Sequence, residues 1–220
     1  MCGRFAITLP HDAMAQLFSA APANNLPNVP NFNVCPTDQI HVVRGSDDGR
    51  KLVSMRWGFL PHWYKATDAG PLLINARAET VADKPAFRVA CRTRRCLIPV
   101  TGFYEWTKDE DGTRWPWYIH AKGPVALAGL WQSWAGEDSP FDTCAIVTTG
   151  ANTAISAIHH RMPVVVDHAD WALWLGEEGH GAAKLMQAAP DELLQFHQVD
   201  RAVNSNRTNG PDLIEPFEKP

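Results

Sequence analysis

The sequence predicts an α+β fold: a single domain with curved, largely antiparallel β-sheets, barrel-like in form, and peripheral helices. Strand-like segments are short and are separated by turn signals, which is typical of antiparallel sheets. Helical segments do not alternate regularly with these strands, as they would in a doubly wound parallel sheet. The chain has 220 residues, 45% of them hydrophobic and nine of them tryptophan, so it can build the core of one domain spanning residues 1–220.

The expected elements follow in order along the chain. Residues 10–20 have a helical pattern in which Met14, Leu17 and Phe18 recur at spacings of three and four. Residues 21–30 contain three prolines and three asparagines and predict a loop. Strands are expected at 40–44, 52–57, 96–104, 117–120, 125–131 and 144–148, with hairpin turns at 45–49 and 109–112. Further helical patterns cover 84–90, 153–158, 167–175 and 181–187.

Charge and cysteine content narrow the functional class. A net charge of −4 and a pI near 6.1 argue against a protein that coats nucleic acid through bulk charge, although they leave room for a local basic cleft. Five cysteines without a CxxC pair predict neither a disulfide framework nor a zinc ribbon. Neither a signal peptide nor a membrane-spanning stretch is evident, so we expect a soluble, cytoplasmic protein.

Cys2 directly follows the initiator Met1, and removal of Met1 would leave a cysteine with both a free α-amine and a thiol. The amine can form an imine with an aldehyde, and the thiol can close onto the imine carbon as a five-membered thiazolidine. The unperturbed pKa values, about 7.7–8.0 for the amine and about 8.5 for the thiol, leave reactive fractions at neutral pH. Small residues also commonly follow an initiator methionine, so the position alone does not establish this chemistry.

Asn75 and Arg77 stand two residues apart and share one side of the chain if residues 73–80 are extended. An amide beside a guanidinium suits the recognition of phosphate and carbonyl groups. A surface strand with polar residues facing water explains the same pattern equally well.

Glu105 lies among aromatic residues, directly after the apolar run 96–100. Burial there would disfavour the charged carboxylate and suit it to general acid/base work. The alternative is a salt-bridged glutamate at a strand end.

His159, His160 and Arg161 precede Pro163, which stops any helix before it. Adjacent histidines point different ways and make a poor metal clamp. One acid/base histidine beside a phosphate-binding arginine is the better functional interpretation, and two solvated loop histidines are the alternative.

The run 57–64 is rich in aromatic residues and is broken by glycine and proline. Its rings could stack on unpaired bases, a contact worth roughly 1–3 kcal/mol per base. They could equally belong to the core.

Taken in order, six motifs resemble the SRAP (SOS-response-associated peptidase) family, over nearly the whole chain from Cys2 to about Pro216. The motifs are Met1-Cys2-Gly3-Arg4-Phe5, Phe32-Asn33-Val34-Cys35-Pro36, Trp57-Gly58-Phe59, Ile74-Asn75-Ala76-Arg77-Ala78-Glu79-Thr80, Gly102-Phe103-Tyr104-Glu105-Trp106 and His159-His160-Arg161-Met162-Pro163. The sequence departs from the family in having His160 where aspartate is common and Cys35 where a small residue is usual.

The resemblance implies an activity in the response to DNA damage. Members of the family crosslink the N-terminal cysteine to an abasic site in single-stranded DNA, near-stoichiometrically, and so shield the lesion. By this resemblance Cys2 is the nucleophile and its catalytic neighbours are Asn75, Glu105 and His159. DNA phosphates are expected at Arg4, Arg77, Thr148 and Arg161, with an aromatic contact to bases at Trp63. We expect a monomer that needs no metal or organic cofactor and is associated with the nucleoid when bound to DNA.

The expected mechanism is formation of a Schiff base and then a thiazolidine with the ring-opened deoxyribose. Glu105 would hold and deprotonate the α-amine, His159 would transfer a proton at the sugar O4′, and Asn75 would orient the Cys2 backbone or the sugar. Two rivals stay open: a cysteine peptidase or other hydrolase that uses Cys2 and His159, and a non-covalent single-stranded DNA-binding module in which Cys2 is dispensable.

Overall fold

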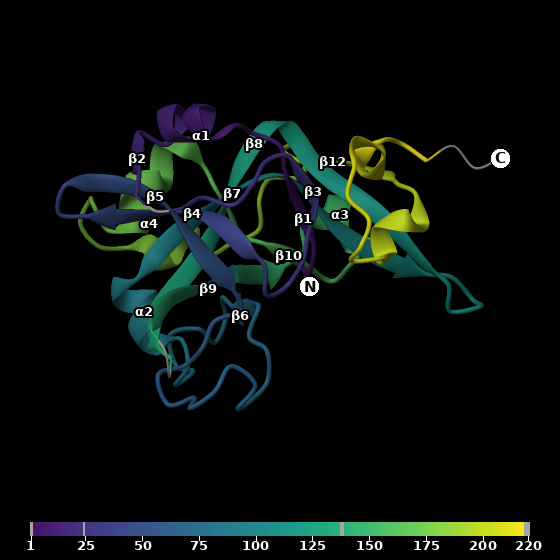
Figure 1. The fold of residues 1–220 in the computed structure, drawn as a ribbon. Helices are drawn as coiled ribbons and strands as arrows, with labels where there is room; N and C mark the ends of the chain where they lie inside the picture. Colours follow the sequence, from purple (N-terminus) through teal and green to yellow (C-terminus); the bar gives the residue numbers. More distant parts are fainter. Residues whose placement is uncertain (1, 24, 137–138, 218–220) are drawn as a thin grey trace.

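The computed structural model of the protein describes residues 2–23, 25–136 and 139–217 (Figure 1). Its strands are β1 (Phe5–Ile7), β2 (Ala20–Pro22), β3 (Asn31–Val34), β4 (Gln39–Ser46), β5 (Gly49–Trp57), β6 (Asn75–Arg77), β7 (Arg95–Lys108), β8 (Arg114–Ala135), β9 (Pro140–Gly150), β10 (Arg161–Pro163), β11 (Val165–Val166) and β12 (Gln195–Gln198). The α-helices are α1 (His11–Leu17), α2 (Arg88–Thr93), α3 (Thr153–Ser156) and α4 (Trp171–Leu175). Short 3-10 helices are η1 (His168–Asp170), η2 (Ala182–Leu185), η3 (Arg201–Asn204) and η4 (Pro211–Ile214).

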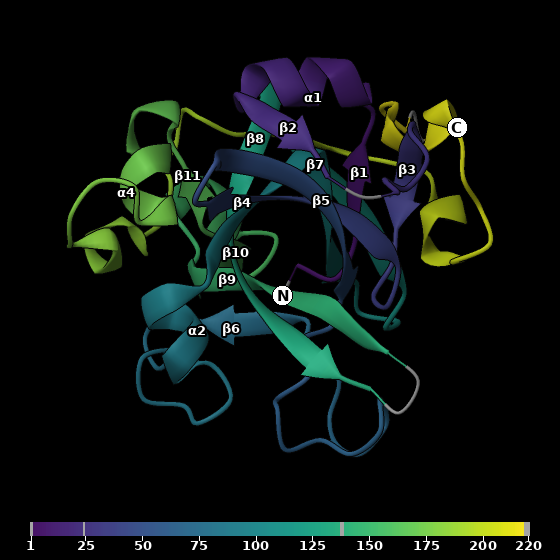
Figure 2. The same cartoon turned by 60° about the vertical axis from the view of Figure 1, so that its left-hand side comes forward.

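Five of the strands close into a barrel. β8 pairs with β9, β9 with β5, β5 with β4 and β4 with β7, and β7 pairs back to β8. Only the β5–β9 pairing in this ring is parallel. Figure 2 shows the strands curving around a common interior, with α1, α2 and α4 outside them. The expected α+β fold, with a curved and largely antiparallel sheet and peripheral helices, is confirmed.

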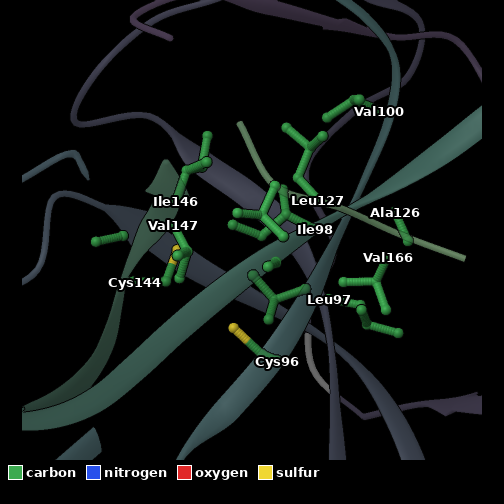
Figure 3. Packing of buried hydrophobic residues seen from close by; sticks show 14 of the residues in the cluster. Cys96, Leu97, Ile98, Val100, Ala126, Leu127, Cys144, Ile146, Val147 and Val166 are labelled. Carbon is green, nitrogen blue, oxygen red and sulfur yellow. The ribbon is translucent and has the colours of Figure 1, made fainter. Parts of the chain in front are cut away.

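The core fills the interior of this ring. Branched aliphatic side chains from β7, β8 and β9, among them Ile98, Leu127 and Ile146, are fully buried and pack against one another (Figure 3). Burying a side chain of this kind is worth about 1.5–3 kcal/mol, so these contacts are a main source of stability. From outside the ring, Phe18 follows α1 and stacks on Trp171 of α4 with ring centroids 4.3 Å apart.

The strand β8 differs from expectation, because two strands were predicted where the structure has one. Its ladder with β7 is nevertheless interrupted: Gly102 faces His120 and Val100 faces Val125, so residues 121–124 have only Thr101 opposite them. Pro124 has no N–H to contribute to a ladder, and the interruption accommodates it. The sequence pattern located this break correctly but did not show that the strand continues beyond it.

Both predicted hairpin turns are confirmed, with Gly49 (φ +100°) and Gly112 (φ +77°) in backbone conformations that favour glycine. The loop expected at 21–30 was wrong at its start, because Ala20–Pro22 pairs in parallel with β5. The helix expected at 84–90 begins only at Arg88, after a series of turns. Very short strands such as β10 carry too few residues to show a period of two.

The N-terminal strand β1 and the short strands β6 and β10 lie at one end of the barrel. β1 lies beside β7, with Phe5 opposite Phe103. β6 and β10 both pair with β9, placing Arg77 opposite Thr148 and Arg161 opposite Gly150. Segments far apart in the sequence therefore meet near the N-terminus (Figure 1). No helix in the described part of the chain is long and apolar enough to cross a membrane.

Candidate active site

Cys2 lies just before β1 and is fully buried. Its carbonyl oxygen accepts a hydrogen bond of 2.9 Å from the side-chain amide of Asn75, at the start of β6. Burial raises the pKa of the Cys2 thiol, and the Glu105 carboxylate raises it further. The thiol is therefore protonated at neutral pH and needs a base before it can attack. Met1 lies outside the described residues, and its removal stays a prediction.

Glu105 occupies the part of β7 that pairs with β8, opposite Trp117, and only 2% of the residue is exposed. Burial raises the pKa of its carboxyl group. A raised pKa makes the carboxylate a better proton acceptor, which is the property expected from the aromatic surroundings of this residue.

His159, between α3 and β10, is the second titratable group close to Glu105. Its Nδ1 lies 3.9 Å from Glu105 Oε1, and 3.0 Å from both the N–H and the carbonyl oxygen of Arg161. In the tautomer in which Nδ1 accepts from the Arg161 N–H, Nε2 carries the proton. Burial lowers the pKa of His159, so its imidazole is neutral at pH 7.

His160 is exposed and stacks on His159, with ring centroids 4.4 Å apart and planes tilted by 29°. The proximity of His159 lowers the pKa of His160. His160 is therefore the harder of the two imidazoles to protonate while His159 is charged.

Asn75 carries an unsatisfied polar atom. Its amide nitrogen donates to Cys2, whereas its buried Oδ1 has no hydrogen-bond partner among the described residues. Leaving such an oxygen unpaired costs about 1–3 kcal/mol. A hydroxyl or amine donor from a bound molecule, or from a processed N-terminus, would satisfy it.

The arginines differ in their surroundings. Arg77 is exposed, and its guanidinium makes no hydrogen bond or salt bridge within the described residues. Arg161 instead forms a bidentate pair with Glu79, at 2.7 and 3.0 Å, and donates to the carbonyl oxygen of Thr148 at 2.7 Å. Thr148 has no exposed surface, so its hydroxyl reaches Arg161 and not the solvent.

Arg4 is held by the C-terminal part of the chain. One guanidinium nitrogen donates to Asn33 Oδ1 at 2.7 Å and to the carbonyl oxygen of Val203 at 2.9 Å. Trp63, in the segment before β6, has 47% of its surface exposed. That ring is available for contact with a ligand, unlike most of the aromatic run around it.

Two cavities are lined by residues that neighbour Cys2. The Glu105 cavity, about 600 Å³, is lined by Gly3, Arg4, Glu105, Trp106, Lys108, Arg114, His159 and Asn204. The Asn75 cavity, about 420 Å³, includes Trp63, Asn75 and Arg77 in its lining. Cys2 is hydrogen-bonded to a lining residue of one cavity and lies within the field of a carboxylate from the other. The structure thus brings together the four residues expected to be catalytic.

Sequence reasoning missed the residues that hold the site in place. Glu79 stood inside a quoted motif, but no local pattern showed that it pairs with Arg161 82 residues away. Asn33 anchors Arg4 and donates to Ser205 and Thr208 in the C-terminal segment.

Cys35, one of the two departures from the family pattern, is half-buried. Its thiol lies 3.2 Å from the Asn33 carbonyl oxygen, and burial raises its pKa. All five cysteines are free thiols. No cluster of three or more His, Cys, Asp or Glu suited to a metal occurs among the residues that the structure describes.

The chain is similar to known proteins over nearly its whole length. A family model described as SOS response associated peptidase (SRAP) matches residues 1–206. The abasic site processing protein YoqW of Bacillus subtilis is 35% identical over 98% of this chain and 99% of its own length. YedK of Escherichia coli, also named an abasic site processing protein, is 28% identical over 98% of this chain and 100% of its own. A solved protein of Bacteroides thetaiotaomicron has the same fold, with a TM-score of 0.86 and 23% identity over 99% of this chain and 100% of that one.

Proposed function

Because the chain belongs to the SOS response associated peptidase family, we propose that it processes abasic sites in single-stranded DNA by crosslinking its N-terminal Cys2 to the lesion. The observation that carries the proposal is the placement of Cys2. Its backbone is held by Asn75, which lines one cavity, and it lies within the field of the carboxylate of Glu105, which lines another.

The first step opens the sugar. An abasic deoxyribose is mainly a closed hemiacetal, and its C1′–O4′ bond must break to expose the aldehyde. His159, which lies beside Glu105, is suited to give a proton from its imidazolium form to O4′, while the C1′ hydroxyl releases its proton to water as it becomes a carbonyl.

The second step forms the Schiff base. Once Met1 has been removed, Glu105 takes a proton from the α-ammonium group of Cys2, and the free amine attacks C1′. Glu105 passes this proton to the C1′ hydroxyl, which leaves as water, and loss of the remaining nitrogen proton to solvent gives the imine and restores the Glu105 carboxylate. The pKa of Glu105, raised by burial, favours this proton transfer.

The third step closes the ring. The thiol loses its proton to Glu105, sulfur bonds to C1′, and the proton passes to the imine nitrogen. The net reaction joins aldehyde, amine and thiol into a thiazolidine with release of one water. Since an imine alone hydrolyses readily and permits strand cleavage by elimination, the second bond stabilises the adduct.

The raised pKa of Cys2 argues against the rival cysteine peptidase. Such an enzyme relies on a thiolate stabilised by a neighbouring positive charge, which lowers the thiol pKa. Here burial and the Glu105 carboxylate act in the opposite direction. In the proposed mechanism the amine attacks first, so the thiol can stay protonated until the imine has formed.

DNA contacts come from side chains around both cavities. Arg77 offers a free guanidinium for a phosphate, and Trp63 offers an exposed ring for a base. Arg161 would contribute with its guanidinium oriented by Glu79, and Thr148 would act through Arg161. An abasic nucleotide in single-stranded DNA requires no base pair to be broken before it enters the site.

The test is incubation of the purified protein with single-stranded DNA, with and without one abasic site, followed by a denaturing gel. We expect one covalent adduct, near-stoichiometric and dependent on the abasic site. Multiple turnover with release of a cleaved peptide would favour the hydrolase, and binding lost on denaturation would favour the non-covalent module.

A further inference from the structure

The Glu105 cavity extends well beyond the acid/base pair, onto the hairpin formed by β7 and β8. Its far end is lined by Trp106, Lys108 and Arg114. Lys108 faces Arg114 across the β7–β8 ladder and lies three residues beyond Glu105, which is about 10 Å along a strand. This hairpin projects from the barrel, away from the segment that carries Trp63 (Figure 1).

Arg114 is positioned before any ligand arrives. Its guanidinium carbon lies 5.1 Å from the centroid of the Trp106 ring, a cation–π contact. The Trp106 indole N–H in turn donates to Asn204 Oδ1 at 2.6 Å. A guanidinium stacked in this way keeps the donors in its plane available, and it loses less freedom when it binds a planar or tetrahedral anion.

The local charge at this end is positive, although the chain as a whole carries −4. Neither the Lys108 nor the Arg114 side chain makes a hydrogen bond or salt bridge within the described residues, although Arg114 is close enough to Glu105 to lower the pKa of its carboxyl group. The single carboxylate in the cavity lining is that of Glu105. At the hairpin tip, Asp109 uses its carboxylate on the Thr113 N–H and the Trp115 indole N–H.

We propose that Lys108 and Arg114 form a binding site for a backbone phosphate on one flank of the abasic nucleotide, opposite the flank held by Arg77. This proposal rests on the proposed function. A strand that places its abasic sugar at Cys2 has phosphates on both sides and must leave the site in two directions. The Asn75 cavity provides one exit with Arg77, and the Glu105 cavity provides the other with Lys108 and Arg114.

The test measures binding of non-abasic single-stranded DNA at several salt concentrations. We expect the double variant Lys108→Ala/Arg114→Gln to reduce the slope of log affinity against log salt by about 0.7, since each phosphate contact to a single strand contributes about that much. The matched control is Lys122→Ala, which removes an exposed charge from β8 outside the cavity. A Lys108→Ala single variant, measured beside the double, reports part of this effect without disturbing the Trp106 contact.

Oligonucleotides with a flank on only one side of the abasic site locate the contact. The double variant should weaken binding to one of the two half-flanked strands, and Arg77→Ala should weaken binding to the other. An unchanged salt slope, or loss on the same strand as Arg77→Ala, would overturn the proposal. Crosslinking by the wild type, scored on the same samples, reports the proposed function separately, so either can fail while the other holds.

Discussion

On one side of Cys2, Glu105 and His159 are buried or half-buried and have shifted pKa values; on the other, Asn75 contributes a neutral amide and Arg77 an exposed guanidinium. Burial suits proton transfer at Glu105, because it moves the pKa of that carboxyl group toward the working pH, and it keeps most of His159 neutral. Exposure suits phosphate binding, because a permanently charged group need not be desolvated until DNA arrives. We therefore expect the side with Glu105 and His159 to set the rate of crosslinking, and the side with Arg77 to add affinity for DNA.

The largest effect should come from Cys2→Ala, which belongs to neither side. Without the thiol no thiazolidine can form, so we expect complete loss of the adduct that survives denaturation. The remaining α-amine can still form an imine, which borohydride reduction would trap. Cys35→Ala is the matched control and should crosslink like the wild type; a stable adduct from Cys2→Ala that disappears in the double variant would make Cys35 the nucleophile.

Next in size are the variants on the proton-transfer side. We expect Glu105→Gln and His159→Ala to slow single-turnover crosslinking by about 10²–10⁴-fold, the usual contribution of a general acid or base. Affinity for non-abasic DNA should stay near that of the wild type. By microscopic reversibility, His159→Ala should also slow release of the DNA in a strand-exchange assay. If either variant loses DNA affinity in proportion to its rate, the two sides are not separable.

Two arginines sharpen the comparison on the binding side. Arg77→Ala should lower affinity for all sequences alike and reduce the salt slope by about 0.7, with unchanged stability. Arg161→Ala should also lower affinity, but it breaks the pair with Glu79 and removes one of the two hydrogen bonds to the Thr148 carbonyl oxygen, which keeps that from the Ala78 N–H, so we expect a loss of about 0.5–1.5 kcal/mol in the free energy of unfolding. Urea denaturation checks both; equal stability of the two variants would contradict the structural role of Arg161.

The smallest effect concerns His160. His159 lowers the pKa of His160, whereas the lowered pKa of His159 comes from burial and its other neighbours, so His160→Ala should leave the pKa of His159 near that of the wild type. If protonated His159 supplies the proton to O4′, crosslinking should rise as pH falls toward its pKa, and that rise should occur at the same pH in His160→Ala. Rates measured from pH 5 to 8 would show it. Should His160→Ala slow both crosslinking and release while His159→Ala behaves as wild type, the two roles are exchanged.

Sequence patterns predicted the parts of the molecule that depend on local periodicity and turn chemistry. The β4–β5 and β7–β8 hairpins were found because Gly49 and Gly112 mark turns that favour glycine. Closure of the barrel was not derivable, because the parallel pairing of β5 with β9 joins segments about 90 residues apart through tertiary packing. The continuity of β8 was hidden by Pro124, which interrupts the ladder but not the strand.

In the site, the sequence identified residues but not their contacts. The resemblance to the family pointed to Cys2, Asn75, Glu105 and His159, and the structure brings these four together. The resemblance could not reveal that the Arg161 guanidinium is paired with Glu79 whereas that of Arg77 has no such partner among the described residues, since both arginines look alike in sequence. Nor could it connect Trp106 with Arg114, whose contact depends on the register of the β7–β8 ladder.

The central claim is that the N-terminal amine and the thiol of Cys2 both bond to the abasic sugar. Intact mass spectrometry of the crosslinked species, followed by fragmentation of its N-terminal peptide, tests it most directly. We expect the mass of the protein without Met1 plus that of the abasic oligonucleotide minus one water, with the modification on Cys2 and no free thiol at that position. A denaturation-stable adduct that retains Met1, or one attached to any other residue, would contradict the account.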